Sequence, residues 1–187
     1  MMVMKRFFLA LTMCLFFIHG KAQMLAVNTD VAFDAMAVQN LGLEMTTGNS
    51  STIGVSVLYA NKPYNKAIKF ALVQPEWRFY FSGRPMHSHF VGLCAIGGTY
   101  DFTNKGKVRD GYGAGIGITF GYVWNLTKSL SLDIHGGLGC IAYRQKEYYE
   151  GDYYDEEYTV NGNVKANASG YWLLPTKIGV SLSYILK

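Results

Sequence analysis

Apolar and polar residues alternate along most of this chain, which is typical of β-strands with one face in an apolar environment. The segment 111–124 shows the alternation best. Its even positions, from Tyr112 to Trp124, are apolar, and five of its seven odd positions are glycine. A strand face made of glycine indicates that other groups approach the backbone closely. The narrow interior of a small β-barrel would produce such crowding.

The same alternation predicts seven further strands. Pro75 falls inside one of them, where it suggests a bulge. In the last strand we expect Trp172 and Leu174 on the apolar face, opposite Lys177 and Gly179. The facing of the fifth segment stays open, because it is apolar on both sides. The seven segments are 25–35, 41–47, 51–59, 67–81, 87–102, 130–142 and 172–186.

The predicted connections alternate between short and long. Turn-like segments occur at 48–50, 82–86 and 125–128, and longer gaps at 61–66, 103–110 and about 144–169. Outer-membrane barrels have an even number of antiparallel strands, short turns at one rim and longer loops at the other. The pattern therefore predicts an all-β, eight-stranded, antiparallel up-and-down transmembrane β-barrel with its long loops extracellular.

The first residues have the composition of a signal peptide. Lys5 and Arg6 precede an apolar run from Phe7 to Ile18, which is too short to span a bilayer. We expect cleavage after residue 23 and a single domain over 24–187. Losing residues 1–23 removes three basic residues and no acidic one, so the net charge falls from +4 to +1. No basic surface remains that would favour nucleic acid.

The polar face of the strands carries charges of both signs. If this face lines the interior, burial requires the charges to pair, and we expect a polar network that fixes strand register. Aromatic residues near several strand ends suggest the two interfaces of a bilayer and favour a membrane barrel with lipid outside. A soluble, lipocalin-like periplasmic ligand carrier is the alternative. The predicted network comprises Asp30, Asp34, Glu44, Glu76, Arg78, Asp133, His135 and Lys177.

Two cysteines remain after the predicted cleavage, Cys94 and Cys140. They fall on strands with one strand between them, about 9–10 Å apart by sheet spacing. A disulfide needs Cα atoms within about 7 Å, so we expect two free thiols.

The segment 147–158 is unusually acidic and rich in tyrosine, with six acidic residues and five tyrosines in twelve positions. A solvated loop, a surface for a protein or glycan partner, and a cation site are three interpretations. It lacks the spacing of a calcium loop, and we predict no metal. The candidate contact residues are Glu147, Tyr148, Tyr149, Glu150, Asp152, Tyr153, Tyr154, Asp155, Glu156, Glu157 and Tyr158.

The sequence His87-Ser88-His89 could be read as a fragment of a hydrolase site or as a pair of metal ligands. It lies at a predicted periplasmic turn without an acidic neighbour in sequence, so the enzyme hypothesis, a barrel acting on envelope lipid, is the weaker alternative. No motif indicates a cofactor. The main hypothesis is a structural or interaction protein that displays loops at the cell surface.

Several short motifs resemble a bacterial family of unknown function, numbered 3575. They are Leu25 to Asp30, Asn40 to Glu44, Pro75 to Tyr80, His89 to Gly92 and Gly98 to Tyr100. The resemblance implies an outer-membrane-type barrel, in families often linked to fimbria-like surface systems. It implies no established activity and no functional residues. Unlike many outer-membrane barrels, the chain does not end on an aromatic residue.

Overall fold

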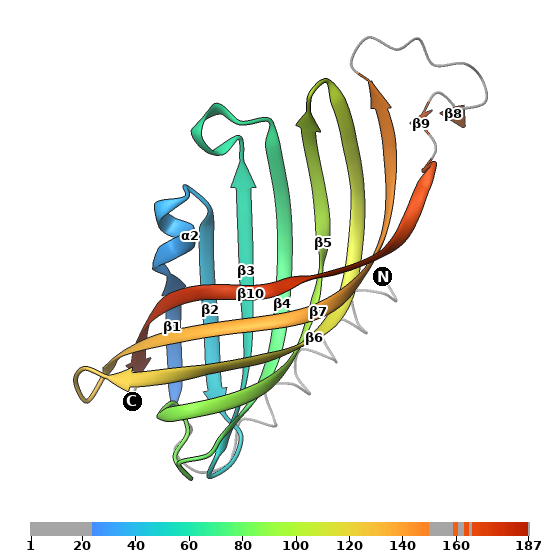
Figure 1. Ribbon diagram of the computed structural model, residues 1–187. Helices are drawn as coiled ribbons and strands as arrows, with labels where there is room; N and C mark the ends of the chain where they lie inside the picture. Colours follow the sequence, from blue (N-terminus) through green and yellow to red (C-terminus); the bar gives the residue numbers. More distant parts are fainter. Residues whose placement is uncertain (1–23, 150–158, 161–162, 165, 187) are drawn as a thin grey trace, which may run out of the picture.

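The computed structural model describes residues 24–149, 159–160, 163–164 and 166–186. The predicted signal peptide therefore lies outside the described residues. Most described residues are in strands, and very few are helical (Figure 1). The strands are β1 (Leu25–Asp30), β2 (Gln39–Thr46), β3 (Ser51–Asn61), β4 (Ile68–Tyr80), β5 (Ser88–Asn104), β6 (Lys107–Asn125), β7 (Leu130–Tyr149), β8 (Thr159–Val160), β9 (Asn163–Val164) and β10 (Ala168–Leu186).

Eight of these strands form one antiparallel sheet that closes into a ring. Going round the ring, the order is β1-β10-β7-β6-β5-β4-β3-β2. β1 closes it by pairing with β10 from Leu25↔Leu186 to Asp30↔Ser181 and with β2 on its other edge. β8 and β9 form a separate hairpin between β7 and β10. The prediction of an all-β fold with eight antiparallel strands is confirmed.

Side chains alternate between the inside and the outside of the ring as predicted for most strands. On β6, Ile116, Ile118 and Phe120 are exposed outside, while Thr119 is fully buried inside. The structure also settles the facing of β5, which the sequence left open. Phe90 and Cys94 are buried, so its even positions face inward.

The segment 25–35 is not one strand, and this part of the prediction is wrong. β1 ends at Asp30, and a short helix, α2 (Val31–Ala35), follows. The Asp30 carboxylate accepts hydrogen bonds from the backbone N–H groups of Ala32 and Phe33, the arrangement of a helix N-cap. No helix among the described residues is long and apolar enough to cross a membrane.

The predicted bulge at Pro75 is also wrong. Pro75 pairs in register with Val55, and only its ladder towards β5 is interrupted, because proline has no N–H to donate. The register shift lies in β10, between Pro175 and Lys177. One extra residue at this point reverses the side of the ring that the preceding residues of β10 face. Trp172 therefore faces inward and stacks on Tyr143 with ring centroids 4.0 Å apart.

The two ends of the ring differ in how far the strands extend, and the longer end is made largely of strand where the sequence predicted loops. β5 and β6 continue to a tight turn at Lys105-Gly106, where both residues have positive φ. β7 reaches Tyr149 and β10 begins at Ala168, so the predicted loops at 103–110 and 144–169 are partly strand. In Figure 1, β5, β6 and β7 extend well beyond β1 and β2 at one end. Between β3 and β4, a 3-10 turn at Pro63–Asn65 makes up the connection.

The glycine face of β6 is crowded, as predicted, but chiefly by its neighbouring strand. A Cβ on Gly115 would lie 2.2 Å from the carbonyl oxygen of Cys140, and one on Gly111 would lie 2.5 Å from that of Arg144. Both oxygens belong to β7. The inner face of the ring therefore brings adjacent backbones so close that only glycine fits there.

Cys94 and Cys140 are free thiols, as predicted. Cys94, on β5, is buried inside the ring with its Sγ 3.8 Å from the Thr176 hydroxyl, and Cys140, on β7, is exposed outside. β6 separates the two strands.

Candidate functional site

Arg78 lies at the centre of a group of buried charges inside the ring. Its Nη1 is 2.7 Å from Asp133 Oδ2 and 3.2 Å from Glu44 Oε2. Its Nη2 is 3.0 Å from Glu76 Oε2. The guanidinium carbon also lies 4.3 Å from the centre of the Phe90 ring. One arginine thus neutralises carboxylates from β2, β4 and β7, because only its planar fork of donors can face several acceptors at once.

Other polar side chains complete the hydrogen bonding of these carboxylates. Glu44 accepts hydrogen bonds from Thr52 at 2.6 Å and from Tyr80 at 2.7 Å. Glu76 accepts from Lys177 at 2.6 Å and from Thr119. Buried carboxylates are tolerated only with such partners. These interactions connect five strands, β2, β3, β4, β6 and β10, across the interior.

His135 lies between two further carboxylates. Its Nε2 is 3.4 Å from Asp30 Oδ2 and its Nδ1 is 3.5 Å from Asp133 Oδ1. At these separations and angles the two pairs of atoms do not form hydrogen bonds, and none of the four atoms has another hydrogen-bond partner among the described residues. An imidazolium, with an N–H at each nitrogen, matches two flanking carboxylates. Asp30 also caps α2, so its carboxylate has one oxygen in each role.

Seven of the eight predicted interior residues come together, and we call them the ion cluster: Asp30, Glu44, Glu76, Arg78, Asp133, His135 and Lys177. Asp34 does not join them. It lies on α2, exposed to solvent, and accepts hydrogen bonds from Thr29 and Asn40. The error follows from the strand predicted over 25–35, since the helix turns Asp34 away from the ring.

The predicted network left out four polar side chains of this interior. Thr52, Tyr80 and Thr119 bind cluster carboxylates, and Gln74 donates to the backbone carbonyl of Thr176 at 2.6 Å. Gln74 and Tyr80, like Glu76 and Arg78, stand at even positions of β4, whose side chains point into the ring, so the alternation of this strand could have added them to the network. The two threonines could have been found in the same way on β3 and β6.

The acidic, tyrosine-rich segment is described only at its beginning. Glu147, Tyr148 and Tyr149 form the end of β7, and residues 150–158, with the remaining predicted contact residues, lie outside the described part of the chain. Glu147 accepts from Lys107 at 2.5 Å and from Arg109 at 3.1 Å. The hydrogen bond from Lys107 lowers the pKa of Glu147 below its ordinary value. The carboxylate of Glu147, on β7, therefore links this strand to β6.

The hydrolase-like fragment does not form a catalytic arrangement. His87 contacts the side chain of Asn125, and His89 lies outside the ring with its imidazole 4.6 Å from the Tyr122 ring. Ser88 has a positive φ of 64° at the start of β5. No hydrogen bond or ion pair of the described residues links these three side chains to an acid, and the described residues contain no cluster of three metal ligands.

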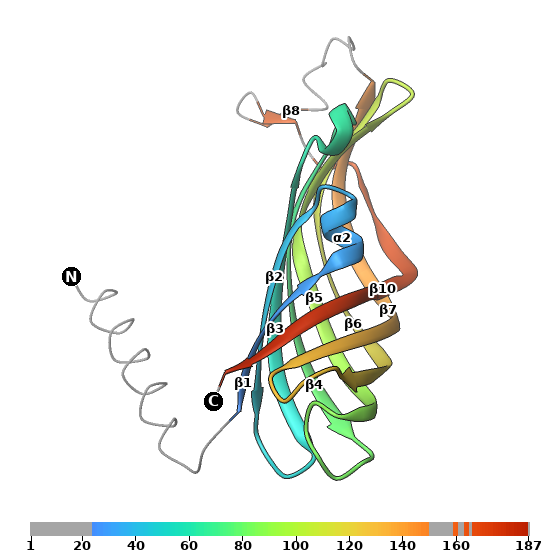
Figure 2. The same cartoon turned by 90° about the vertical axis from the view of Figure 1, so that its left-hand side faces the viewer.

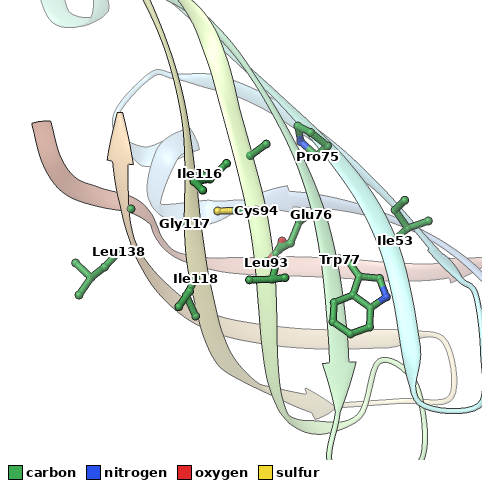
Figure 3. Close-up of a pocket in the computed structure, with 12 residues that line it drawn as sticks. Ile53, Pro75, Glu76, Trp77, Leu93, Cys94, Ile116, Gly117, Ile118 and Leu138 are labelled. Atoms are coloured by element: carbon green, nitrogen blue, oxygen red, sulfur yellow. The ribbon is translucent and has the colours of Figure 1, made fainter. Parts of the chain in front are cut away.

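A hollow on the outer surface lies over the ring's middle. Figure 3 shows its wall of apolar side chains from β3 to β7, including Ile53, Trp77, Leu93, Ile118 and Leu138. Glu76 reaches it only from the inside, where its side chain is buried. The hollow is therefore part of an apolar outer surface and offers no separate set of reactive groups.

The sequence pattern of one protein family matches residues 7–186, nearly the whole chain. The chain belongs to family DUF3575. That family is described as a protein of unknown function, so membership confirms the resemblance and assigns no activity. No curated protein and no solved structure matches this DUF3575 chain. Any function for it must therefore be argued from its own residues.

Proposed function

We propose that this DUF3575 protein is a non-conducting outer-membrane β-barrel that presents one extended rim to a surface partner. The observation that carries the proposal is the inversion of its two faces: charges are buried inside, and large apolar side chains are exposed outside. Exposed residues on every side of the ring include Leu41, Val57, Trp77, Leu93, Ile116, Leu138 and Leu173. Soluble monomers rarely expose contiguous apolar patches above a few hundred Å².

A row of charges bounds the apolar outer surface at the extended end. Lys69 pairs in register with Asp101, Asp101 with Asp110, and Asp110 with Lys146, across four neighbouring strands. Moving along the strands from that row towards the middle of the ring, the next residues whose side chains point outward are Ala71, Thr99 and Tyr112. Such a boundary is expected where membrane strands leave the hydrocarbon and enter the headgroups.

The ion cluster supports a scaffold in preference to a pore. Eight strands leave an interior just wide enough for side chains, and here salt-bridged side chains of four strands, β2, β4, β7 and β10, meet across it. A soluble ligand carrier would instead need an apolar interior cavity. The buried charges therefore favour a closed barrel that interacts through its surface and does not conduct through its lumen.

The extended rim has the composition of a contact surface. On its inner side, Tyr143 stacks on Trp172, and Tyr100 donates to Gln145 at 2.6 Å. Tyrosine and tryptophan provide large amphipathic contact area at low entropic cost. The tyrosine-rich segment 150–158 continues directly from this rim. A surface protein or glycan is the partner that such groups suit.

Heat modifiability on a detergent gel tests the barrel. We expect the chain in the outer-membrane fraction, with an unboiled band that migrates differently from the boiled one. A chain recovered in the soluble periplasmic fraction, with one band before and after boiling, would contradict the proposal. Deleting residues 150–158 then tests the rim, because the deletion spares Glu147 and its strand contacts. The folded band should persist while binding to the surface partner is lost.

A further inference from the structure

Arg144, near the end of β7, presents an unpaired guanidinium on the outer surface of the extended end. Its side chain is exposed, and no described residue forms an ion pair or a hydrogen bond with it. By contrast, Lys107 and Arg109 on the neighbouring strand β6 both bind Glu147. Arg144 therefore has N–H donors in a planar fork that no described residue uses.

Hydroxyl groups and a second cation surround Arg144. It pairs in register with Tyr112 on β6 and with Ser169 on β10, and all three side chains are exposed. Lys146, two residues further along β7, points the same way, and its ammonium lies 3.7 Å from the carboxylate of Asp110. Two cations and one anion leave an excess of one positive charge. We call Tyr112, Arg144, Lys146 and Ser169 the outer basic patch.

The length of the strands places this patch relative to the apolar band. The even positions of β7 from Leu130 to Ala142 point outward and carry no charge, and Arg144 is the first charged residue after them. At about 3.3 Å per residue this run is about 40 Å long, and at a tilt of about 40° it rises about 30 Å. That is the thickness of the hydrocarbon core. On the proposed function, Arg144 therefore lies among the headgroups.

Small side chains adjoin the patch on its apolar side. Ala142 and Ala114 pair in register there, and Gly97 on β5 continues the row. A Cβ on Gly97 would meet nothing within 4 Å. Tyr171, which is 79% exposed on β10, borders the row at its other end. The surface beneath Arg144 is thus low between exposed tyrosines, which leaves room for an acyl chain.

We propose that the outer basic patch binds the phosphate of a lipid in the leaflet at the extended end. This inference rests on the proposed function. A guanidinium binds phosphate through two parallel N–H···O bonds, and the hydroxyls of Tyr112 and Ser169 are further donors. The excess positive charge complements the phosphate. The row of small residues favours a lipid over free phosphate, because an attached acyl chain packs there.

Native mass spectrometry of the purified full chain in a neutral detergent tests the patch. The probes are dimyristoyl phosphatidic acid, dimyristoylglycerol with the same chains, and inorganic phosphate. We expect the wild type to retain the phosphatidic acid, also with equimolar inorganic phosphate present, and not to retain the diacylglycerol. Arg144→Gln should weaken retention about tenfold, the effect of losing hydrogen bonds to a charged group.

Arg84→Gln is the matched control. Arg84 is exposed in the turn between β4 and β5, at the opposite end of the ring, and the substitution removes the same charge. Its retention of phosphatidic acid should equal that of the wild type. Equal losses in the two variants would mean unspecific attraction and would overturn the inference. Retention of the diacylglycerol, or displacement of the lipid by equimolar inorganic phosphate, would also overturn it.

Unboiled and boiled samples of the same preparations test the barrel separately. A wild-type band that shifts on boiling, from protein that does not retain phosphatidic acid, refutes the lipid site and leaves the proposed function standing. A band that does not shift refutes the proposed function and the lipid site with it.

Discussion

The carboxylate of Asp30 joins α2 to His135. Its Oδ2 lies 3.4 Å from His135 Nε2, while its Oδ1 accepts from the backbone of Ala32 and Phe33 at the start of the helix. The helix that follows β1 is thus held by the same side chain that enters the ion cluster. In Figure 2, α2 lies between β2 and β10, at the point where β1 ends and no longer pairs with β10.

Variants of Asp30 should separate the two roles of its carboxylate. Asp30→Asn keeps an oxygen for the cap and loses the charge facing His135, whereas Asp30→Ala loses both. We expect amide protection at Ala32 and Phe33 to survive in Asp30→Asn and to disappear in Asp30→Ala. Loss of the cap should cost about 0.5–2 kcal/mol. Equal exchange in the two variants would show that the cap contributes nothing to α2.

Removing the charge of Arg78 should destabilise the barrel strongly. Arg78→Met leaves Glu44, Glu76 and Asp133 buried without their common partner. Breaking a buried ion pair in this way typically costs about 3–5 kcal/mol. The fraction of the folded, heat-modifiable band in a urea series measures the change.

Arg109→Met is the matched control for Arg78→Met. Arg109 pairs with Glu147 where both side chains are partly exposed. Such pairs contribute about 0–1 kcal/mol, so the folded band of Arg109→Met should persist to nearly the wild-type urea concentration. If the two variants unfold at the same concentration, burial of the ion cluster does not stabilise the barrel.

Acid should loosen the extended rim at Glu147. Because its pKa is lowered in the folded protein, the stabilisation is complete above its ordinary value and is lost as pH falls through the folded value. We expect amide exchange at Lys107 to Arg109 to accelerate below about pH 4. Glu147→Gln should abolish this pH dependence in that segment. A wild-type rim that keeps the same protection through this range would contradict the assignment.

Two glycines give a comparison of crowded and free backbone. A Cβ on Gly121, inside the ring, would lie 2.5 Å from the Ile134 carbonyl oxygen and 2.7 Å from the Phe90 ring. One on Gly97, outside, meets nothing within 4 Å. Gly121→Ala should therefore lower the urea midpoint of the folded band, by an amount equivalent to about 1–3 kcal/mol. Gly97→Ala should leave it within about 0.5 kcal/mol.

The sequence determined the strand faces wherever alternation was uninterrupted. Each residue in a strand points opposite to its neighbours, so Glu76, Arg78, Asp133 and His135 could be placed on one side before any contact was known. The predicted order of the strands, with one strand between those of Cys94 and Cys140, was enough to exclude a disulfide between them. The side to which a residue points within a strand depends only on its position relative to its neighbours in sequence, so it can be predicted without tertiary information.

Only the tertiary structure decided where alternation breaks and what lies across the ring. Asp30 ends β1 because its carboxylate caps α2 and faces His135, more than 100 residues away in sequence. The bulge before Lys177 reverses Trp172. The local pattern could not show this, because Tyr171 and Leu173 on one side of the strand are as apolar as Trp172 and Leu174 on the other. The meeting of Arg78 with Glu44 and Asp133 depends on ring closure, which sets register between strands that no local period specifies.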